Sequence, residues 1–109
     1  TELQIDTISN LKPSFYIGTP SFLKIILEKA KQNNTDISCL KRGLVGAEPL
    51  PTSLRSFLSD EGVEVMQMYG IAETGCISYE TKDSNNNLVN GMIVEEDIIL
   101  EVEQLMQEY

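Results

Sequence analysis

Apolar and polar residues follow two different periods along the first two thirds of the chain, and together they predict strands that alternate with helices. Three short apolar runs, at residues 15–17, 40–45 and 63–68, have the length and composition of β-strands. Between the first two runs, apolar residues recur at helical spacing. They are Phe22, Leu23, Ile26, Leu27 and Ala30. A second helical pattern follows the second run and carries Leu54, Phe57 and Leu58 on one face. The order β-α-β-α-β favours parallel strands joined by helical crossovers.

The connections carry recognisable start and stop signals. Thr19 is suited to be an N-cap, with Pro20 at the first helical position. Residues 46–51 contain two prolines, which predicts a loop rather than regular structure. We expect Thr52 or Ser53 to cap the second helix.

The two ends of the chain differ from this core. Residues 1–13 are expected to be irregular or a short helix, and the strand at 15–17 is expected to be buried. Beyond Gly75 the pattern predicts strands at 76–81, 92–94 and 98–103, with a loop at 83–87. The fold class is therefore α/β. A parallel core at 14–75 is followed by a short antiparallel strand or hairpin region at 76–109.

Length and charge limit the possible functions. The 109 residues, 41% of them apolar, suffice for one modest core, and a chain that begins with Thr1 is expected to be an excised segment. A net charge of −9 makes nucleic acids and anionic membranes poor partners. No apolar run approaches the ~20 residues of a membrane span.

The chain has two cysteines, Cys39 and Cys76, and no histidine. A Cys–His dyad, a Ser–His–Asp triad and a histidine-containing zinc site cannot be built from it alone. The simplest interpretation of each cysteine is a small buried apolar residue, reduced in a cytoplasmic setting. A thiol enzyme that uses Cys76 is an alternative, but it lacks a histidine base.

Candidate chemistry gathers where the predicted strands end. In a parallel α/β sheet, ligands bind beyond the carboxyl ends of the strands. Three predicted loops follow such ends: Gly18-Thr19, residues 46–51 and residues 69–75. Their convergence on one edge predicts a binding site.

Each candidate also has an ordinary structural interpretation. Tyr69 before Gly70 can form a flat platform for a nucleobase, or can simply close the core before a turn. Gly46-Ala47-Glu48 can let a planar ring lie against backbone, or can be a common turn. Glu73 can bind Mg²⁺, which needs one or two carboxylates, or can face solvent. Neither GxxxxGK[ST] nor GxGxxG is present, so these residues do not encode a complete triphosphate site.

Three segments in this order resemble one family. They are PSFYIGTPSFL at 13–23, GAEPLP at 46–51 and MYGIAET at 68–74. Together they are similar to the adenylate-forming acyl-CoA ligases, in particular the phenylacetate–CoA ligase-like branch. The similarity runs from Pro13 to Glu80 and is weaker over 88–102.

The resemblance implies an activity in two half-reactions. A carboxylate attacks the α-phosphate of ATP and gives an acyl-adenylate, and the thiol of coenzyme A then displaces AMP. The implied partners are ATP or AMP, Mg²⁺, coenzyme A and a small carboxylic acid, which is aromatic in this branch.

The resemblance also implies roles for individual residues. The implied nucleotide-binding residues are Gly46, Ala47, Glu48, Pro49, Gln67, Met68, Tyr69, Gly70, Glu73 and Thr74. Among them Gln67 would reach the adenine amino group, Tyr69 would stack on adenine, and Glu73 would hold Mg²⁺. The acyl pocket would be bordered by Tyr16, Gly18, Gly75 and Cys76.

The chain departs from the family pattern at one position and lacks whole parts of it. Ala72 stands where the family usually has Ser or Thr, so a contact to the α-phosphate is missing unless Thr74 replaces it. The phosphate loop, the ribose-binding Asp and the mobile lysine-bearing domain are absent. Residues 1–109 are thus expected to be a central fragment of an AMP-binding domain, inactive alone and able to dimerise through exposed edges. The alternative is a non-catalytic α/β interaction module.

Overall fold

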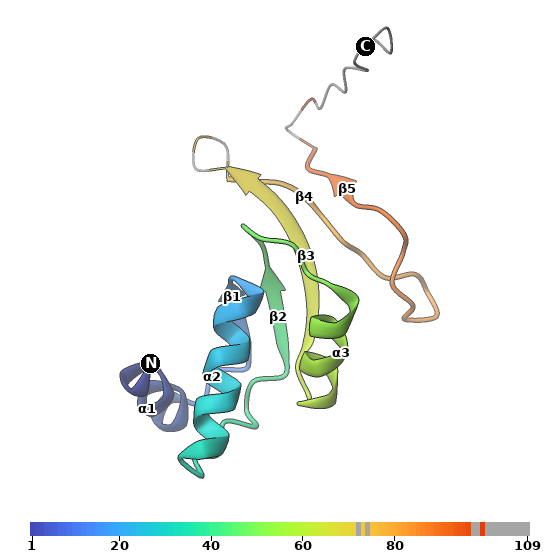
Figure 1. Ribbon diagram of the computed structural model, residues 1–109. Coiled ribbons are helices and arrows are strands. Elements are labelled where there is room, and N and C mark those ends of the chain that lie inside the picture. The colour runs from blue at the N-terminus through green and yellow to red at the C-terminus, as the bar shows by residue number, and fades with distance from the viewer. Residues whose placement is uncertain (72, 74, 97–98, 100–109) are drawn as a thin grey trace, which may run out of the picture.

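Eight helices and strands make up the part of the chain that the computed structural model describes, residues 1–71, 73, 75–96 and 99. In chain order they are α1 (Glu2–Leu11), β1 (Phe15–Gly18), α2 (Pro20–Gln32), β2 (Arg42–Val45), α3 (Thr52–Asp60), β3 (Glu64–Ile71), β4 (Gly75–Tyr79) and β5 (Ile93–Val94) (Figure 1). The predicted β-α-β-α-β order is confirmed. None of the described helices is long and apolar enough to cross a membrane.

The strands form one sheet in the order β1-β2-β3-β4-β5. The pairs β1–β2 and β2–β3 are parallel, whereas β3–β4 and β4–β5 are antiparallel. Parallel pairing of β3 ends at Val45↔Gln67, and antiparallel pairing begins at Met68↔Tyr79. The predicted parallel core followed by an antiparallel region is confirmed, and β3 belongs to both parts.

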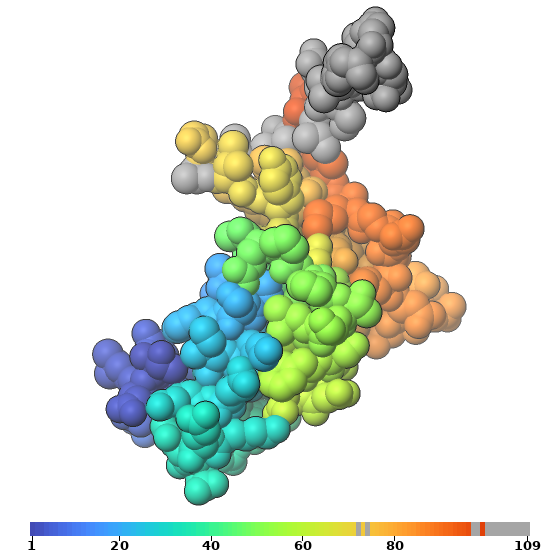
Figure 2. Space-filling view, viewed as in Figure 1, coloured from blue at the N-terminus to red at the C-terminus, as the bar shows by residue number. Residues whose placement is uncertain are grey.

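Helices α2 and α3 lie on the same face of the sheet (Figure 1), where they form adjoining parts of the surface (Figure 2), and the core lies beneath them. Helix α2 begins as its sequence predicts, because the Thr19 side chain accepts a hydrogen bond from the Phe22 N–H at 3.3 Å and Pro20 occupies the first turn. Fully or almost fully buried side chains include Ile5, Leu23, Val45, Leu58 and Val63. Helix α1 adds Ile5 to the same core.

Strand β1 is less buried than its composition predicts. Phe15 is 50% exposed and Ile17 is 67% exposed, whereas Tyr16 is half-buried against the core. Successive side chains of a strand point to opposite faces, and among the described residues only one face of this edge strand is covered by helices. The expectation of a buried strand was therefore wrong for two of its three residues.

Two other boundaries differ from the predictions. The N-cap of α3 is Pro51, in an extended conformation and without a side-chain cap bond, so neither Thr52 nor Ser53 caps that helix. The loop at 83–87 is confirmed, since one Asp83 carboxylate oxygen accepts the backbone N–H groups of Asn85 and Asn87, both at 2.9 Å. Apart from Ile99, the strand expected at 98–103 lies outside the described residues.

Candidate functional site

Two of the three predicted loops lie side by side at the carboxyl ends of β1 and β2. The Gly46 N–H donates to the Gly18 carbonyl oxygen at 3.1 Å, which continues the parallel ladder beyond Val45. Residues 18–19 and 46–51 thus share one edge of the sheet, as the strand pattern predicts.

The start of the 46–51 loop is pressed against β3. A Cβ atom on Gly46 would lie 2.9 Å from the Met68 carbonyl oxygen and 3.0 Å from Met68 Cγ. Ala47 then takes a left-handed conformation, with φ of 69°. Gly46 is buried, whereas Ala47, Glu48 and Pro49 are exposed. The loop therefore presents a small, open surface directly beside the β3 backbone.

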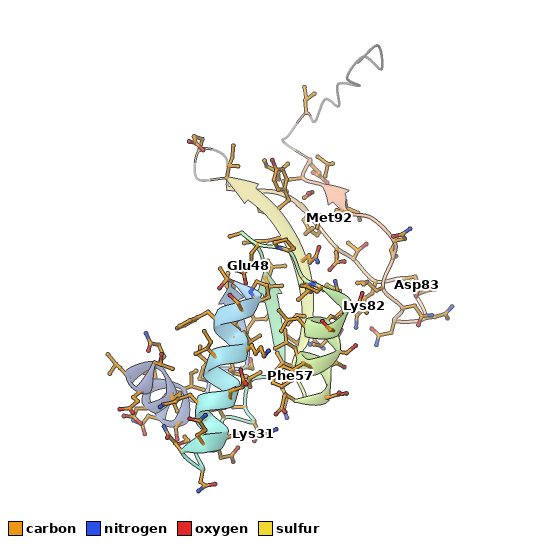
Figure 3. The ribbon with its side chains drawn as sticks, viewed as in Figure 1. Lys31, Glu48, Phe57, Lys82, Asp83 and Met92 are labelled. Carbon is orange, nitrogen blue, oxygen red and sulfur yellow. The ribbon has the colours of Figure 1, made fainter. Side chains whose placement is uncertain are left out.

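Glu48 fastens this loop to helix α2. Figure 3 shows Glu48 beside the start of the helix. Its Oε1 accepts a hydrogen bond at 2.7 Å from the N–H of Ser21, in the first turn. Hydrogen bonding from Ser21 lowers the pKa of the Glu48 carboxyl below its ordinary value of 4.5. A negative charge at a helix N-terminus is favourable, so this carboxylate anchors the loop to α2.

The anchor should respond to acid. The pKa of Glu48 is lower in the folded chain than in the unfolded chain. The stability that Glu48 contributes is therefore fully present above about pH 4.5, and it is lost as the pH falls through the lower pKa of the folded chain. We expect the Ser21 amide resonance to titrate with a midpoint below 4.5 in an NMR pH series. Glu48→Gln should abolish that titration, and a midpoint above the ordinary value would contradict the anchor.

Tyr16 and Gly18, the predicted acyl-pocket residues on β1, contact each other. The Tyr16 hydroxyl donates to the Thr19 carbonyl oxygen at 2.8 Å, and a Cβ atom on Gly18 would lie 2.5 Å from the Tyr16 hydroxyl oxygen. Burial raises the pKa of Tyr16. The ring and the glycine are thus part of the same edge as the 46–51 loop.

The third predicted loop is in large part a strand. Tyr69 and Gly70 continue β3, opposite Ser78 and Cys76 of β4, and the register shifts so that Ile77 has no partner in this ladder. Four further residues, at about 3.3 Å each, carry the hairpin about 13 Å beyond Gln67. The expectation of a loop from Tyr69 to Gly75 was wrong, since Gly70 serves close strand packing rather than a turn.

This hairpin forms the second group of predicted site residues. The Tyr69 side chain is 52% exposed, and Glu73 is exposed in the turn between the strands. Gly70 lies directly against Gly75 and Cys76. Neither Tyr69 nor Glu73 is buried, so both can meet a ligand. Thr74 and Ala72 lie outside the described residues.

Basic side chains are rare near these residues. Between residues 43 and 81 the sequence has a single basic side chain, Arg55. Among the described residues, no cluster of three or more acidic, cysteine or histidine side chains is placed to hold a metal ion. The exposed Glu73 carboxylate can offer one oxygen ligand to a cation, and an anionic ligand would find few cationic partners in this part of the sequence.

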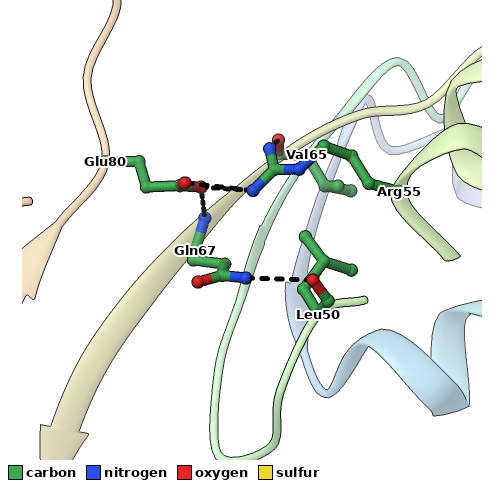
Figure 4. A network of polar contacts seen from close by, with 5 residues as sticks. All are labelled: Leu50, Arg55, Val65, Gln67 and Glu80. Atoms are coloured by element: carbon green, nitrogen blue, oxygen red, sulfur yellow. Dashed lines mark hydrogen bonds and ion pairs between the residues drawn. The ribbon is translucent and has the colours of Figure 1, made fainter. Parts of the chain in front are cut away.

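Sequence reasoning missed the side chains that brace this site. Arg55 of α3 donates through Nη1 to the Val65 carbonyl oxygen at 3.1 Å and through Nη2 to Glu80 at 2.8 and 3.0 Å (Figure 4). Glu80 Oε1 also accepts the Gln67 N–H at 2.6 Å. The isolation of Arg55 in a long stretch without other basic residues was the one available signal.

Known proteins share both the sequence pattern and the fold. A family model described as AMP-binding enzyme matches residues 1–102. The phenylacetate-coenzyme A ligase of Aromatoleum evansii is 32% identical over 76 residues, which cover 67% of this chain and 17% of that protein.

Solved structures agree in fold. An open conformation of 2-hydroxyisobutyryl-CoA ligase in complex with 2-HIB-AMP and CoA superposes with a TM-score of 0.68 at 20% identity, covering 84% of this chain and 22% of that one. Anthranilate CoA ligase in complex with anthranoyl-AMP gives 0.61 at 18% identity, covering 81% and 21%. The chain thus spans about a fifth of the length of these proteins.

Proposed function

Because the chain belongs to the family of AMP-binding enzymes, we propose that it is part of an ATP-dependent ligase that joins a carboxylic acid to coenzyme A. It contributes the adenine wall and part of the acyl wall. The observation that carries this proposal is the 46–51 loop, which exposes Ala47, Glu48 and Pro49 beside the strand that bears the exposed Tyr69 ring.

The nucleotide role follows from the surfaces available. The open backbone of Ala47 and Glu48 accommodates one face of adenine, and the Tyr69 ring stacks on the other. Stacking of a base on an aromatic side chain contributes about 1–3 kcal/mol. Gln67 directs its side-chain amide to the adenine amino group, and Glu73 supplies one oxygen ligand to Mg²⁺, whose remaining positions are filled by phosphate and water.

The acyl side is assigned to Tyr16, Gly18, Gly75 and Cys76. A small aromatic acid is the proposed substrate class, supported by the similarity to a phenylacetate ligase and by the fold shared with an anthranilate ligase. The acid's carboxylate attacks the α-phosphate, pyrophosphate leaves, and the coenzyme A thiol then displaces AMP. A cytoplasmic location is proposed because both described cysteines are free thiols.

The described chain alone should not catalyse these steps. It has no phosphate-binding loop, and the single basic residue between 43 and 81 is already paired with Glu80. It should bind AMP weakly through the adenine wall. Ala72 precedes Glu73 and lacks the hydroxyl that the family usually has at this position. We propose that the Thr74 hydroxyl supplies the missing contact to the α-phosphate.

Tyr69→Ala should weaken AMP binding by about five- to a hundredfold, because it removes base stacking. The measurement is an NMR titration of the chain with AMP, read at the amides of Gly46, Ala47 and Gly70. Tyr69→Phe keeps the ring and should bind within about twofold of the unchanged chain, which makes it the matched control.

Two outcomes of that titration would contradict the proposal. Equal AMP affinity for the unchanged chain and Tyr69→Ala would remove Tyr69 from the adenine wall. No response of the 46–51 loop in the unchanged chain would favour the alternative, a non-catalytic interaction module that uses the exposed Phe15 and Ile17 on the open face of the sheet. Rapid coenzyme A ester formation by the 109 residues alone would contradict the inactivity.

A further inference from the structure

At the point where the sheet changes from parallel to antiparallel, two backbone groups on the β4-facing edge of β3 bind side chains instead of a neighbouring strand. The Val65 carbonyl and the Gln67 N–H point to the same side, because residues two apart in a strand are equivalent. Side chains bind both groups: Arg55 donates to Val65, and Glu80 accepts from Gln67 (Figure 4). The two members of an ion pair therefore bind two backbone groups that a neighbouring strand would otherwise bind.

This ion pair is well shielded from water. The side chains of Arg55 and Glu80 are 27% and 12% exposed. Glu80 is held twice, since its own N–H also donates to the Gln67 carbonyl oxygen at 2.9 Å. The carboxylate thus binds one guanidinium and one backbone N–H, which gives it a fixed position.

The side chain of Gln67 connects the ion pair to the 46–51 loop. Its side-chain Nε2 donates to the Leu50 carbonyl oxygen at 3.4 Å, near the end of the loop (Figure 4). At its other end the loop is held by Glu48 on Ser21 and by Gly46 on Gly18. The exposed residues 47–49 are therefore held at Glu48 and on both sides, and Gln67 provides the contact on the Leu50 side.

We propose that Arg55 and Glu80 are a positioning pair, which fixes Gln67 and, through Leu50, sets the form of the 46–51 loop for adenine. In this proposal neither side chain belongs to the surface that meets the nucleotide. The nucleotide part of this inference rests on the proposed function, whereas the positioning of Gln67 does not.

The pair should therefore affect adenine recognition more than overall stability. Glu80→Gln keeps the shape and one acceptor oxygen but removes the charge that holds Arg55. It should speed hydrogen exchange of the Gln67 N–H by about tenfold and shift the resonances of the Gln67 side-chain amide and of residues 47–50. Binding of AMP should weaken by about tenfold, and the preference for AMP over GMP should fall.

The control is another acidic partner of an ion pair. Glu61→Gln removes the pair between Glu61 and Lys31, at the far end of α2, and also lowers the negative charge by one. It should leave the exchange of Gln67 and the binding of AMP unchanged. Arg55→Lys keeps a positive charge beside Glu80 but loses the N–H group that binds the Val65 carbonyl oxygen. Its Gln67 exchange rate and its AMP affinity should therefore lie between those of Glu80→Gln and those of the unchanged chain.

The outcomes separate the two proposals. Unchanged Gln67 exchange and loop resonances in Glu80→Gln would overturn the positioning pair, whatever happens to AMP. Altered exchange and loop resonances with unchanged AMP affinity and selectivity would overturn its link to adenine. If the unchanged chain does not respond to AMP, the proposed adenine wall is wrong, and so is the link between the ion pair and adenine. The hydrogen exchange of Gln67 then decides by itself whether the pair positions Gln67.

Discussion

Replacing Leu58 with alanine should lower the free energy of unfolding by about 2–5 kcal/mol, the range for removing a fully buried leucine side chain. Leu58 is 0% exposed and lies between α3 and the sheet in the centre of the core. A domain of this size has a total stability of about 5–15 kcal/mol. A large part of it therefore depends on this one side chain, and a urea titration followed by circular dichroism should show the loss.

Leu54 provides the matched comparison. It lies one turn earlier on the same helix but is only partly buried against the core. Leu54→Ala leaves a smaller cavity, so its effect should be clearly smaller than that of Leu58→Ala. Equal losses for the two variants would mean that α3 does not bury its Leu58 face as described.

Replacing Gly70 with alanine should destabilise the β3–β4 hairpin, although alanine is otherwise preferred over glycine inside a strand. The preference for alanine is worth about 0.5–1 kcal/mol. Against it, the new Cβ would lie 2.6 Å from the Gly75 carbonyl oxygen and 3.1 Å from the Gly75 carbonyl carbon. These are backbone atoms, so relief requires the strands to separate, and overpacking costs about 1–3 kcal/mol.

The measurement for Gly70→Ala is hydrogen exchange of the β4 amides, which should become faster at Cys76 and Ser78 while the α2 amides stay protected. Gly43→Ala is the control, because its Cβ would come no closer than 3.3 Å to a Val65 methyl group and 3.4 Å to the Tyr16 carbonyl oxygen. Protection of the hairpin equal to that of the unchanged chain would show that β3 and β4 are not packed this closely at Gly70.

Local patterns were sufficient to predict the parallel core. The apolar spacing of α2, the Thr19 cap and the proline-rich loop at 46–51 are decided within a few residues, and each has one consistent interpretation. The exposure of Phe15 and Ile17 depends instead on what covers the second face of the sheet, which no local pattern contains.

The candidate site was predicted at its parallel edge and misjudged at its hairpin. The sequence Tyr69-Gly70 has the composition of a strand end followed by a turn, and only a partner strand reveals that Gly70 is required for close packing. The Arg55–Glu80 pair could not be predicted either, since it joins a residue of α3 to one that follows β4, 25 positions later. The roles proposed for individual residues come from the family resemblance and not from the residues alone.

The order of the strands in the sheet bears on how this part of the chain is made. Among the described residues, each strand after β1 pairs with the strand that precedes it in sequence, so no pairing skips over an intervening strand. A growing polypeptide can thus add β2 to β1 and β3 to β2 as each leaves the ribosome. The pair Arg55–Glu80 can form only after β4 has emerged, so the 46–51 loop would acquire its final form only when synthesis has passed Glu80.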